Sequence, residues 1–162
     1  RYNRKCEMEF QIHVNRLTHN FLKVQLKGQP LTAAHPIWRY LYLMAQTPKY
    51  NIGKPKLDMT YTVIMHEFHG YRADGLLNEV ESHMFCKHVE MYILAELLEL
   101  LEDSDDYNET FFQFQEQYMI SDLDFSRDRM YKFYERYRNG SLKNRYACDG
   151  ILVPEVNSQS TL

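Results

Sequence analysis

Apolar residues recur at three- and four-residue spacing through most of this chain, which is the pattern of amphipathic helices. The pattern is dense between Asp58 and Phe85, where we predict two short helices joined by a turn at Gly70 and Tyr71. The apolar stripes comprise Met59, Val63 and Phe68 in the first helix and Leu76, Leu77, Val80 and Met84 in the second, which Asp74 is placed to cap. A helical hairpin this short cannot bury its apolar face alone, so it predicts neighbours built in the same way.

Helical segments and a loop are predicted before this hairpin. Segment 4–27 has the spacing of one helix or of two in succession, and a glycine and a proline then stop it. Thr32 is placed to cap a helix over 33–46, in which Pro36 is either tolerated near the start or marks the true first turn. Segment 47–56 contains two prolines and a glycine, and this composition predicts a loop.

Further helices are predicted after the hairpin, and a tail follows them. The helical segments are 89–102, 107–119 with Asp106 as its cap, 127–140 after the capping residue Ser126, and 142–148. In segment 107–119 we expect Phe111, Phe114, Tyr118 and Met119 to face the core. From Gly150 onward the period disappears, which predicts a tail that is extended on a partner or disordered. The chain is therefore predicted to be all-α, with about seven or eight helices in one domain over 1–149 and a tail over 150–162.

The central hairpin resembles the pentatricopeptide repeat. That repeat opens its first helix with a Val-Thr-Tyr-like triplet and carries a Leu or Phe stripe, ending near a Met, in its second. The corresponding residues here are Met59, Thr60 and Tyr61, then Gly70 in the turn, then Leu77, Val80 and Met84. The predicted hairpins start about 32 and then about 37 residues apart, near the ~33 to 47 residues of helical-hairpin repeats. The resemblance implies a helical-hairpin solenoid of the pentatricopeptide or tetratricopeptide type.

The resemblance also implies a class of function. Pentatricopeptide repeats bind single-stranded RNA one base per repeat, through small polar side chains at the fifth and last positions. Val63 and Ile93 occupy those positions here, and neither can form a hydrogen bond with a base edge. We therefore expect a scaffold that binds protein, and keep an organellar RNA-binding pentatricopeptide-type protein or a mitoribosomal subunit as the alternative.

In length, predicted helix count and tail, the chain is similar to a small pentatricopeptide-like accessory subunit on the catalytic head of the euglenozoan mitochondrial ATP synthase. The similarity implies a non-catalytic adaptor on the matrix side of a mitochondrion, with its presequence removed. The chain begins with Arg1, which fits either a mature chain or a trimmed fragment. We predict that the apolar tail residues dock on the protein partner, because such a segment has little reason to be apolar if it is free in solvent. These residues are Ile151, Leu152, Val153 and Pro154.

Charge, cysteine content and hydropathy limit the classes of partner and the cellular compartments that fit this chain. A net charge of −3 and a pI near 6.2 argue against a surface dedicated to nucleic acid. Cys6, Cys86 and Cys148 are far apart and odd in number, so a disulfide framework is not expected, and a reducing or organellar interior fits better. No run approaches the ~20 apolar residues of a membrane span.

Histidines form one candidate metal site. His66, Glu67 and His69, with His83 and His88 further along, offer imidazole and carboxylate groups that suit zinc or iron. However, His66 and His69 are three residues apart, whereas paired ligands on one helical turn normally sit four apart. We therefore expect these histidines to lie on polar faces or turns and predict neither a metal nor a cofactor.

Three other features could suggest chemistry, but each is expected to have a structural or surface role. Cys86 is expected to be a small buried apolar side chain and not a nucleophile. Segment 127–138 alternates basic and aromatic residues, which would suit nucleic acid, but we expect its tyrosines to line the core and its arginines to face water. The acids Glu99, Glu102, Asp103, Asp105 and Asp106 lack the glycine and spacing of a calcium loop, so a solvated acidic corner or a contact with a basic partner is expected. No catalytic motif appears, and the chain is not predicted to be an enzyme.

Overall fold

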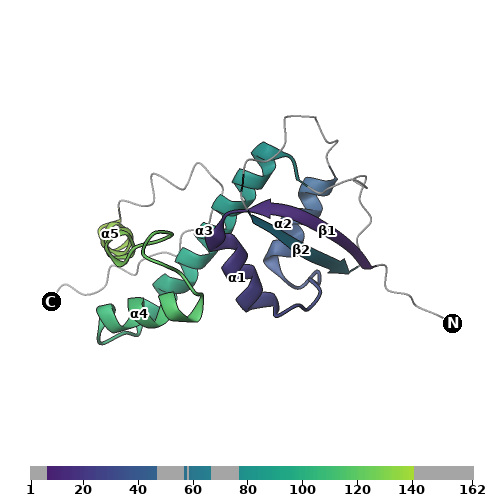
Figure 1. The fold of residues 1–162 in the computed structure, drawn as a ribbon. Helices are drawn as coiled ribbons and strands as arrows, with labels where there is room; N and C mark the ends of the chain where they lie inside the picture. Colours follow the sequence, from purple (N-terminus) through teal and green to yellow (C-terminus); the bar gives the residue numbers. More distant parts are fainter. Residues whose placement is uncertain (1–6, 47–56, 58, 67–76, 141–162) are drawn as a thin grey trace. The chain divides into compact units, whose positions relative to one another are not determined.

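The computed structural model describes residues 7–46, 57, 59–66 and 77–140 (Figure 1). Its elements are β1 Glu7–Val14, α1 Arg16–Leu26, α2 Pro36–Ala45, β2 Met59–His66, α3 Glu79–Glu102, α4 Tyr107–Gln117 and α5 Arg127–Arg138. The chain divides into two compact units, residues 1–93 and 94–162, and α3 runs through the boundary. Among the described helices, none is both long and apolar enough to cross a bilayer.

The first unit contains a two-stranded antiparallel sheet where helices were predicted. β1 pairs with β2 so that Glu7 lies opposite His66 and Val14 lies opposite Met59. Alternate residues of both strands are buried, and these are Phe10, Ile12, Val14, Val63 and Met65. The prediction of an all-α solenoid is therefore wrong, and the described fold is mixed α/β.

The reason for this error lies in the periodicity of β2. An apolar residue that recurs after four positions, as Met59 and Val63 do, fits the period of a strand as well as that of a helix. The β-branched and aromatic residues of β2 favour a strand, but its partner β1 is separated from it by α1 and α2. The pairing that stabilises the strand is therefore absent from any local window of sequence.

The strand β2 takes the place of the first helix of the predicted hairpin, on which the pentatricopeptide resemblance was based. The triplet Met59, Thr60 and Tyr61 begins a strand and not a helix. Residues 67–76, with the predicted turn at Gly70, lie outside the described residues. The predicted helix at 142–148 and the tail over 150–162 lie outside them as well.

The helices α1 and α2 begin at polar caps. The Asn15 Oδ1 accepts a hydrogen bond from the Thr18 amide at 2.9 Å and starts α1, so only the second part of the segment 4–27 is helical. The His35 Nδ1 accepts one from the Ile37 amide at 3.2 Å and starts α2. Pro36 is therefore the true first turn of α2, and Thr32 is not its cap.

α3 is one continuous helix where two were predicted. It begins with a reciprocal capping box, in which the Glu81 amide donates to Asn78 Oδ1 at 2.9 Å and the Asn78 amide donates to Glu81 Oε1 at 3.0 Å. Apolar residues occur on several of its faces, so the sequence does not show which face is buried. In the first unit α3 buries Phe85, Cys86 and Val89, whereas Val80 and Met84, which were predicted to form the stripe, are exposed.

The core of the first unit joins the sheet to the three helices that accompany it in Figure 1. Phe21 of α1 meets Tyr92 of α3 edge to face, with ring centroids 5.7 Å apart, and Tyr40 of α2 stacks on His88 of α3 at 4.2 Å. The indole Nε1 of Trp38 donates to the backbone oxygen of His66 at 2.9 Å, which ties α2 to β2.

The second unit comprises the C-terminal part of α3, with α4 and α5 packed together. The caps predicted for α4 and α5 are confirmed: Asp106 accepts from the Glu109 amide and Ser126 from the Arg129 amide, both at 3.2 Å. The core residues of this unit are Leu94, Leu97, Leu98, Leu101, Phe111, Phe114, Tyr118, Ile120, Phe125, Met130, Phe133, Tyr134 and Tyr137.

The first unit is expected to lose stability in mild acid because of two histidines. Burial lowers the pKa of His35 and of His88 from the ordinary value of 6.5, and a protonated His35 Nδ1 could no longer accept the capping hydrogen bond. Below about pH 6.5 the unfolded chain therefore binds more protons than the folded chain, and the free energy of unfolding falls until the folded pKa is passed.

Urea unfolding followed by the fluorescence of the single tryptophan, Trp38, checks this at several pH values between about 7.5 and about 5.5. His35→Asn retains a capping acceptor that does not titrate, so its loss of stability in acid should be smaller than that of the wild type. The exposed His83 supplies the control, because His83→Asn should leave the wild-type pH dependence unchanged. Equal pH dependence in all three proteins would contradict the assignment.

Candidate interaction surface

α4 has a buried face and an exposed apolar stripe. Its buried face consists of Phe111, Phe114 and Gln115, and Tyr118 follows at the C-cap. The exposed stripe carries Phe112 and Glu116, which are four residues apart and so lie on one side of α4. Met119 follows the end of the helix and lines the same surface hollow as these two residues. Phe112 is 44% exposed and Met119 is 46% exposed, so the prediction that Met119 faces the core is wrong.

Met119 also has an unusual backbone conformation. Its φ is 53°, in the left-handed region that favours glycine. The Ile120 amide donates to the Gln115 carbonyl at 2.8 Å, and the Met119 amide donates to the Glu116 carbonyl at 3.2 Å. These two bonds form the Schellman motif that ends many helices, usually with glycine at the position that Met119 occupies here. A long apolar side chain is therefore held at the surface in a position where it adds backbone strain.

A hydrogen-bonded turn follows and exposes a second apolar side chain. Ser121 Oγ donates to Asp124 Oδ2 at 2.9 Å, and the amides of Asp124 and Phe125 both donate to the Ser121 carbonyl at 3.0 Å. Phe125 is buried and anchors the end of the turn. Leu123 lies within the turn and is 92% exposed, so a regular structure holds a leucine in solvent.

The buried amide of Gln115 connects α4 to this turn. Its Nε2 donates to Asp122 Oδ1 at 2.9 Å and to the backbone carbonyl of Phe125 at 3.0 Å. The hydrogen bond from Gln115 is the largest effect on the pKa of Asp122 and lowers it. Burial opposes this effect, and the backbone and charge of Arg127 lower the pKa further. One side chain thus fixes both ends of the segment that carries Leu123.

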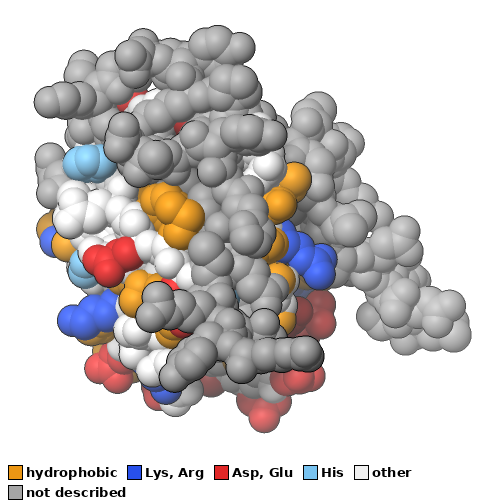
Figure 2. Space-filling view, turned by 90° about the vertical axis from the view of Figure 1, so that its right-hand side faces the viewer, with side chains coloured by type: hydrophobic (Ala, Val, Ile, Leu, Met, Phe, Trp, Pro, Cys, Tyr) orange, Lys and Arg blue, Asp and Glu red, His pale blue; other side chains and the backbone are white. Residues whose placement is uncertain are grey.

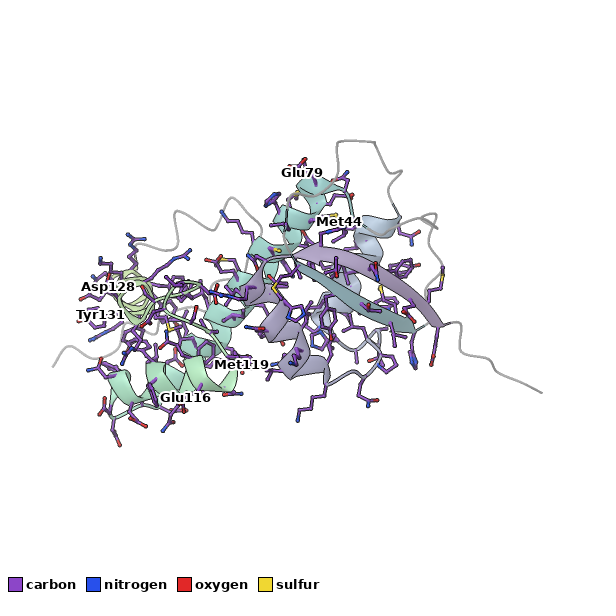
Figure 3. All side chains as sticks on the ribbon, viewed as in Figure 1. Met44, Glu79, Glu116, Met119, Asp128 and Tyr131 are labelled. Carbon is purple, nitrogen blue, oxygen red and sulfur yellow. The ribbon has the colours of Figure 1, made fainter. Side chains whose placement is uncertain are left out.

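We use the name α4 corner for the group of exposed residues Phe112, Glu116, Met119, Asp122 and Leu123. A shallow hollow of about 380 Å³ lies at this surface, lined by Phe112, Met119 and Ile120 together with Glu116, Asp122 and Arg127. Figure 3 labels Glu116 and Met119 near the C-terminal end of α4. Apolar contact area thus lies beside carboxylates, an arrangement that suits a protein segment with both apolar and charged groups.

The sequence that leads to the α4 corner is strongly acidic, and Arg127 is the cation that lines the hollow. From Val89 to Ser126 the sequence has eleven Asp and Glu residues and no Lys, Arg or His. Of the cations in α5, Lys132 pairs with Asp128 at 2.8 Å, the Arg129 guanidinium lies over the Phe125 ring at 4.5 Å, and Arg127 lines the hollow. An excess of charge of one sign attracts partners of the opposite sign and raises their rate of association.

The basic aromatic segment 127–138 is mainly structural. Tyr134 and Tyr137 are buried: the Tyr134 hydroxyl donates to the Tyr107 hydroxyl at 3.3 Å, and the Tyr137 hydroxyl donates to Glu102 Oε1 at 3.1 Å. Burial, with the Tyr107 hydrogen bond second, raises the pKa of Tyr134 to about 12. The expectation that tyrosines line the core is confirmed for these two, while Tyr131 is exposed.

The acidic corner and Cys86 have structural roles as well. Asp106 caps α4, and Glu102 accepts the hydrogen bond of a buried tyrosine, while Glu99, Asp103 and Asp105 are exposed. Cys86 is buried, its Sγ accepts from the Asn15 amide at 3.4 Å, and burial raises the pKa of its thiol. The expectation that Cys86 is a small buried side chain is confirmed.

The structure separates the roles of the histidines that it describes. His66 Nε2 lies 2.9 Å from Glu7 Oε1, His88 stacks on Tyr40, and His83 is exposed. Within the described part of the chain no three His, Cys, Asp or Glu side chains gather as metal ligands would. Glu67 and His69 lie outside that part.

The predicted partner-binding tail is not described by the structure, and comparison with known proteins offers no match from which to locate it. Ile151, Leu152, Val153 and Pro154 lie outside the described residues. No protein-family model matches this chain, and neither the curated proteins nor the solved structures contain a match to it.

The α4 corner was not identified from the sequence, although one signal was available. Leu123 stands between two aspartates in a short polar segment, where a large apolar side chain is unusual.

Replacing Gln115 by methionine should destabilise the second unit. The change keeps the length of the side chain but removes the amide that donates to the Phe125 carbonyl. Because that buried carbonyl then lacks its hydrogen bond, the free energy of unfolding should fall by about 1–3 kcal/mol. Gln113→Met is the matched control, because the Gln113 amide bonds Glu109 on the exposed side of α4 and its loss should cost less than about 0.5 kcal/mol. Urea unfolding followed by circular dichroism measures both, and equal losses would exclude the role assigned to Gln115.

Replacing Met119 by glycine should leave stability unchanged or raise it by up to about 1 kcal/mol, because glycine adopts a positive φ without strain. Lys27→Gly is the matched control, since Lys27 ends α1 with a φ of 48° and should behave in the same way. Thermal unfolding by circular dichroism compares the variants. A loss of more than about 1 kcal/mol for Met119→Gly alone would mean that the Met119 side chain serves folding.

Proposed function

We propose that this chain is a non-catalytic subunit that binds a protein partner in a larger assembly through the α4 corner. The observation that carries the proposal is Leu123, which a hydrogen-bonded turn holds 92% exposed. Met119, held at the surface by a strained helix end, supports it. Exposed apolar residues on a fixed backbone are typical of interaction sites, because binding them costs little conformational entropy.

Other exposed apolar residues give weaker support for an interface. Leu43 on α2 is 67% exposed, but it projects from an ordinary helix position without a positive φ. On the face drawn in Figure 2, the visible hydrophobic side chains form small separate groups among charged and other residues. Such scattered apolar side chains are normal on a protein surface and need no partner.

The assembly itself stays a prediction. The described residues do not form the repeat that suggested a pentatricopeptide-like protein, so the proposal rests on the α4 corner instead. The matrix side of a mitochondrion and the catalytic head of ATP synthase remain predictions from chain length and from the apolar tail 151–154.

Affinity capture tests the proposal with variants of the full chain. The tagged wild type should recover a defined protein in stoichiometric amounts from an extract of its source cells, with or without nuclease. Leu123→Asp should lower that recovery about tenfold or more, because it places a charge in the apolar contact. Quantitative mass spectrometry of the captured proteins is the measurement.

Leu43→Asp supplies the matched control, since it adds the same charge at another exposed leucine and should leave capture unchanged. Equal recovery by the wild type and by Leu123→Asp would reject the α4 corner as the binding surface. Loss of every captured protein after nuclease treatment would favour the RNA-binding alternative, for which the exposed arginines of α5 and Tyr131 are the available groups.

A further inference from the structure

We infer that the segment bound at the α4 corner is a cationic peptide whose apolar side chain enters the hollow between α4 and the start of α5. The inference rests on the proposed function and adds the chemistry of the partner. Its basis is the coincidence of three features: apolar residues in the wall of the hollow, two carboxylates against one guanidinium, that of Arg127, in its lining, and a stretch of sequence from Val89 to Ser126 without cations.

The charge argument concerns the margin of the hollow. Glu116 lies one helical turn from Phe112 on α4 and lines the same hollow as Phe112 and Met119, so a side chain in contact with either apolar group passes close to a carboxylate. Asp122 adds a second carboxylate, held in its charged form by the hydrogen bond from Gln115. The guanidinium of Arg127 also lines the hollow, so the two carboxylates leave a net negative charge there and not an uncompensated pair. An acidic segment would meet repulsion here, whereas Lys or Arg beside the apolar anchor would be attracted.

The shape argument concerns what the hollow can hold. Sites that enclose a small molecule occupy roughly 300–1,000 Å³ and surround most of the ligand. The hollow here, about 380 Å³, is at the lower end of that range and is shallow. It therefore suits one or two side chains of a longer segment, while Leu123, which follows the lining residue Asp122 in the sequence, offers further exposed apolar area.

One segment of this chain has the same chemistry as the inferred partner. Residues 141–162 contain Lys143, Arg145 and the apolar run 151–154. This segment is the alternative occupant, and a competition experiment separates it from a partner: if it filled the hollow, its removal would tighten the binding of an added peptide.

Fluorescence anisotropy with a labelled synthetic peptide, KLLKLLKKLLKLLK, tests the inference on the full chain. Two matched peptides separate the contributions: ELLELLEELLELLE reverses the charge, and KSSKSSKKSSKSSK removes the apolar side chains. The Lys-Leu peptide should bind, with affinity that falls as salt is added, and both matched peptides should bind at least about tenfold more weakly.

Variants then locate the binding. Leu123→Ser and Met119→Gly should each weaken the binding of the Lys-Leu peptide about tenfold, whereas Leu43→Ser and Lys27→Gly should not change it. Equal binding of the Glu-Leu peptide, equal binding of the Lys-Ser peptide, or no effect of the two α4-corner variants would overturn the inference. Tighter binding by a chain that ends at Gly140 would overturn it as well, because residues 141–162 would then be the occupant. Partner capture that depends on Leu123, without any binding of the Lys-Leu peptide, would leave the proposed function intact and refute only the cationic partner.

Discussion

The hydrogen bonds of Gln115 are the constraint on which the α4 corner depends. Its backbone carbonyl accepts from the Ile120 amide and ends α4, and its side-chain amide donates to Asp122 and to the Phe125 carbonyl. The end of the helix and the turn after it are therefore held by one buried residue. Without those bonds, Leu123 would lie on a loop with many conformations, and ordering that loop on binding would reduce affinity.

The apolar residues of the α4 corner oppose stability more than they contribute to it. Glycine would suit the backbone of Met119 better, and a polar residue would suit the exposed position of Leu123 better. Local departures from the favoured residue, in a segment that several hydrogen bonds hold in place, are expected where function and not folding determines the side chain. The same reasoning separates this surface from Leu43, which departs from no backbone preference.

The features that could be predicted from the sequence depend on interactions between residues that are close together along the chain. Asp106 and Ser126 were identified as caps because a cap and its helix are neighbours in sequence, and Pro36 was one of two predicted starts for α2 for the same reason. The pairing of β1 with β2 joins distant segments, and its two-residue period was confused with that of a helix. Met119 was assigned to the core because it continues the apolar pattern of α4, although the helix had already ended two residues earlier.

For a related reason, the net charge of the whole chain was not sufficient to predict the chemistry of the partner. A net charge of −3 indicates a nearly balanced surface, yet the stretch from Val89 to Ser126 carries eleven acids and no base. The compensating cations lie outside this stretch, and five of them are in α5, where Lys132 and Arg129 have partners of their own and Arg127 lines the hollow. Charges separated by more than about 8–10 Å are largely screened at physiological salt, so a partner at the α4 corner responds to the local carboxylates and not to the sum. The chemistry of recognition is therefore set by the order of charges along the chain, together with the turn that brings apolar and acidic groups to one surface.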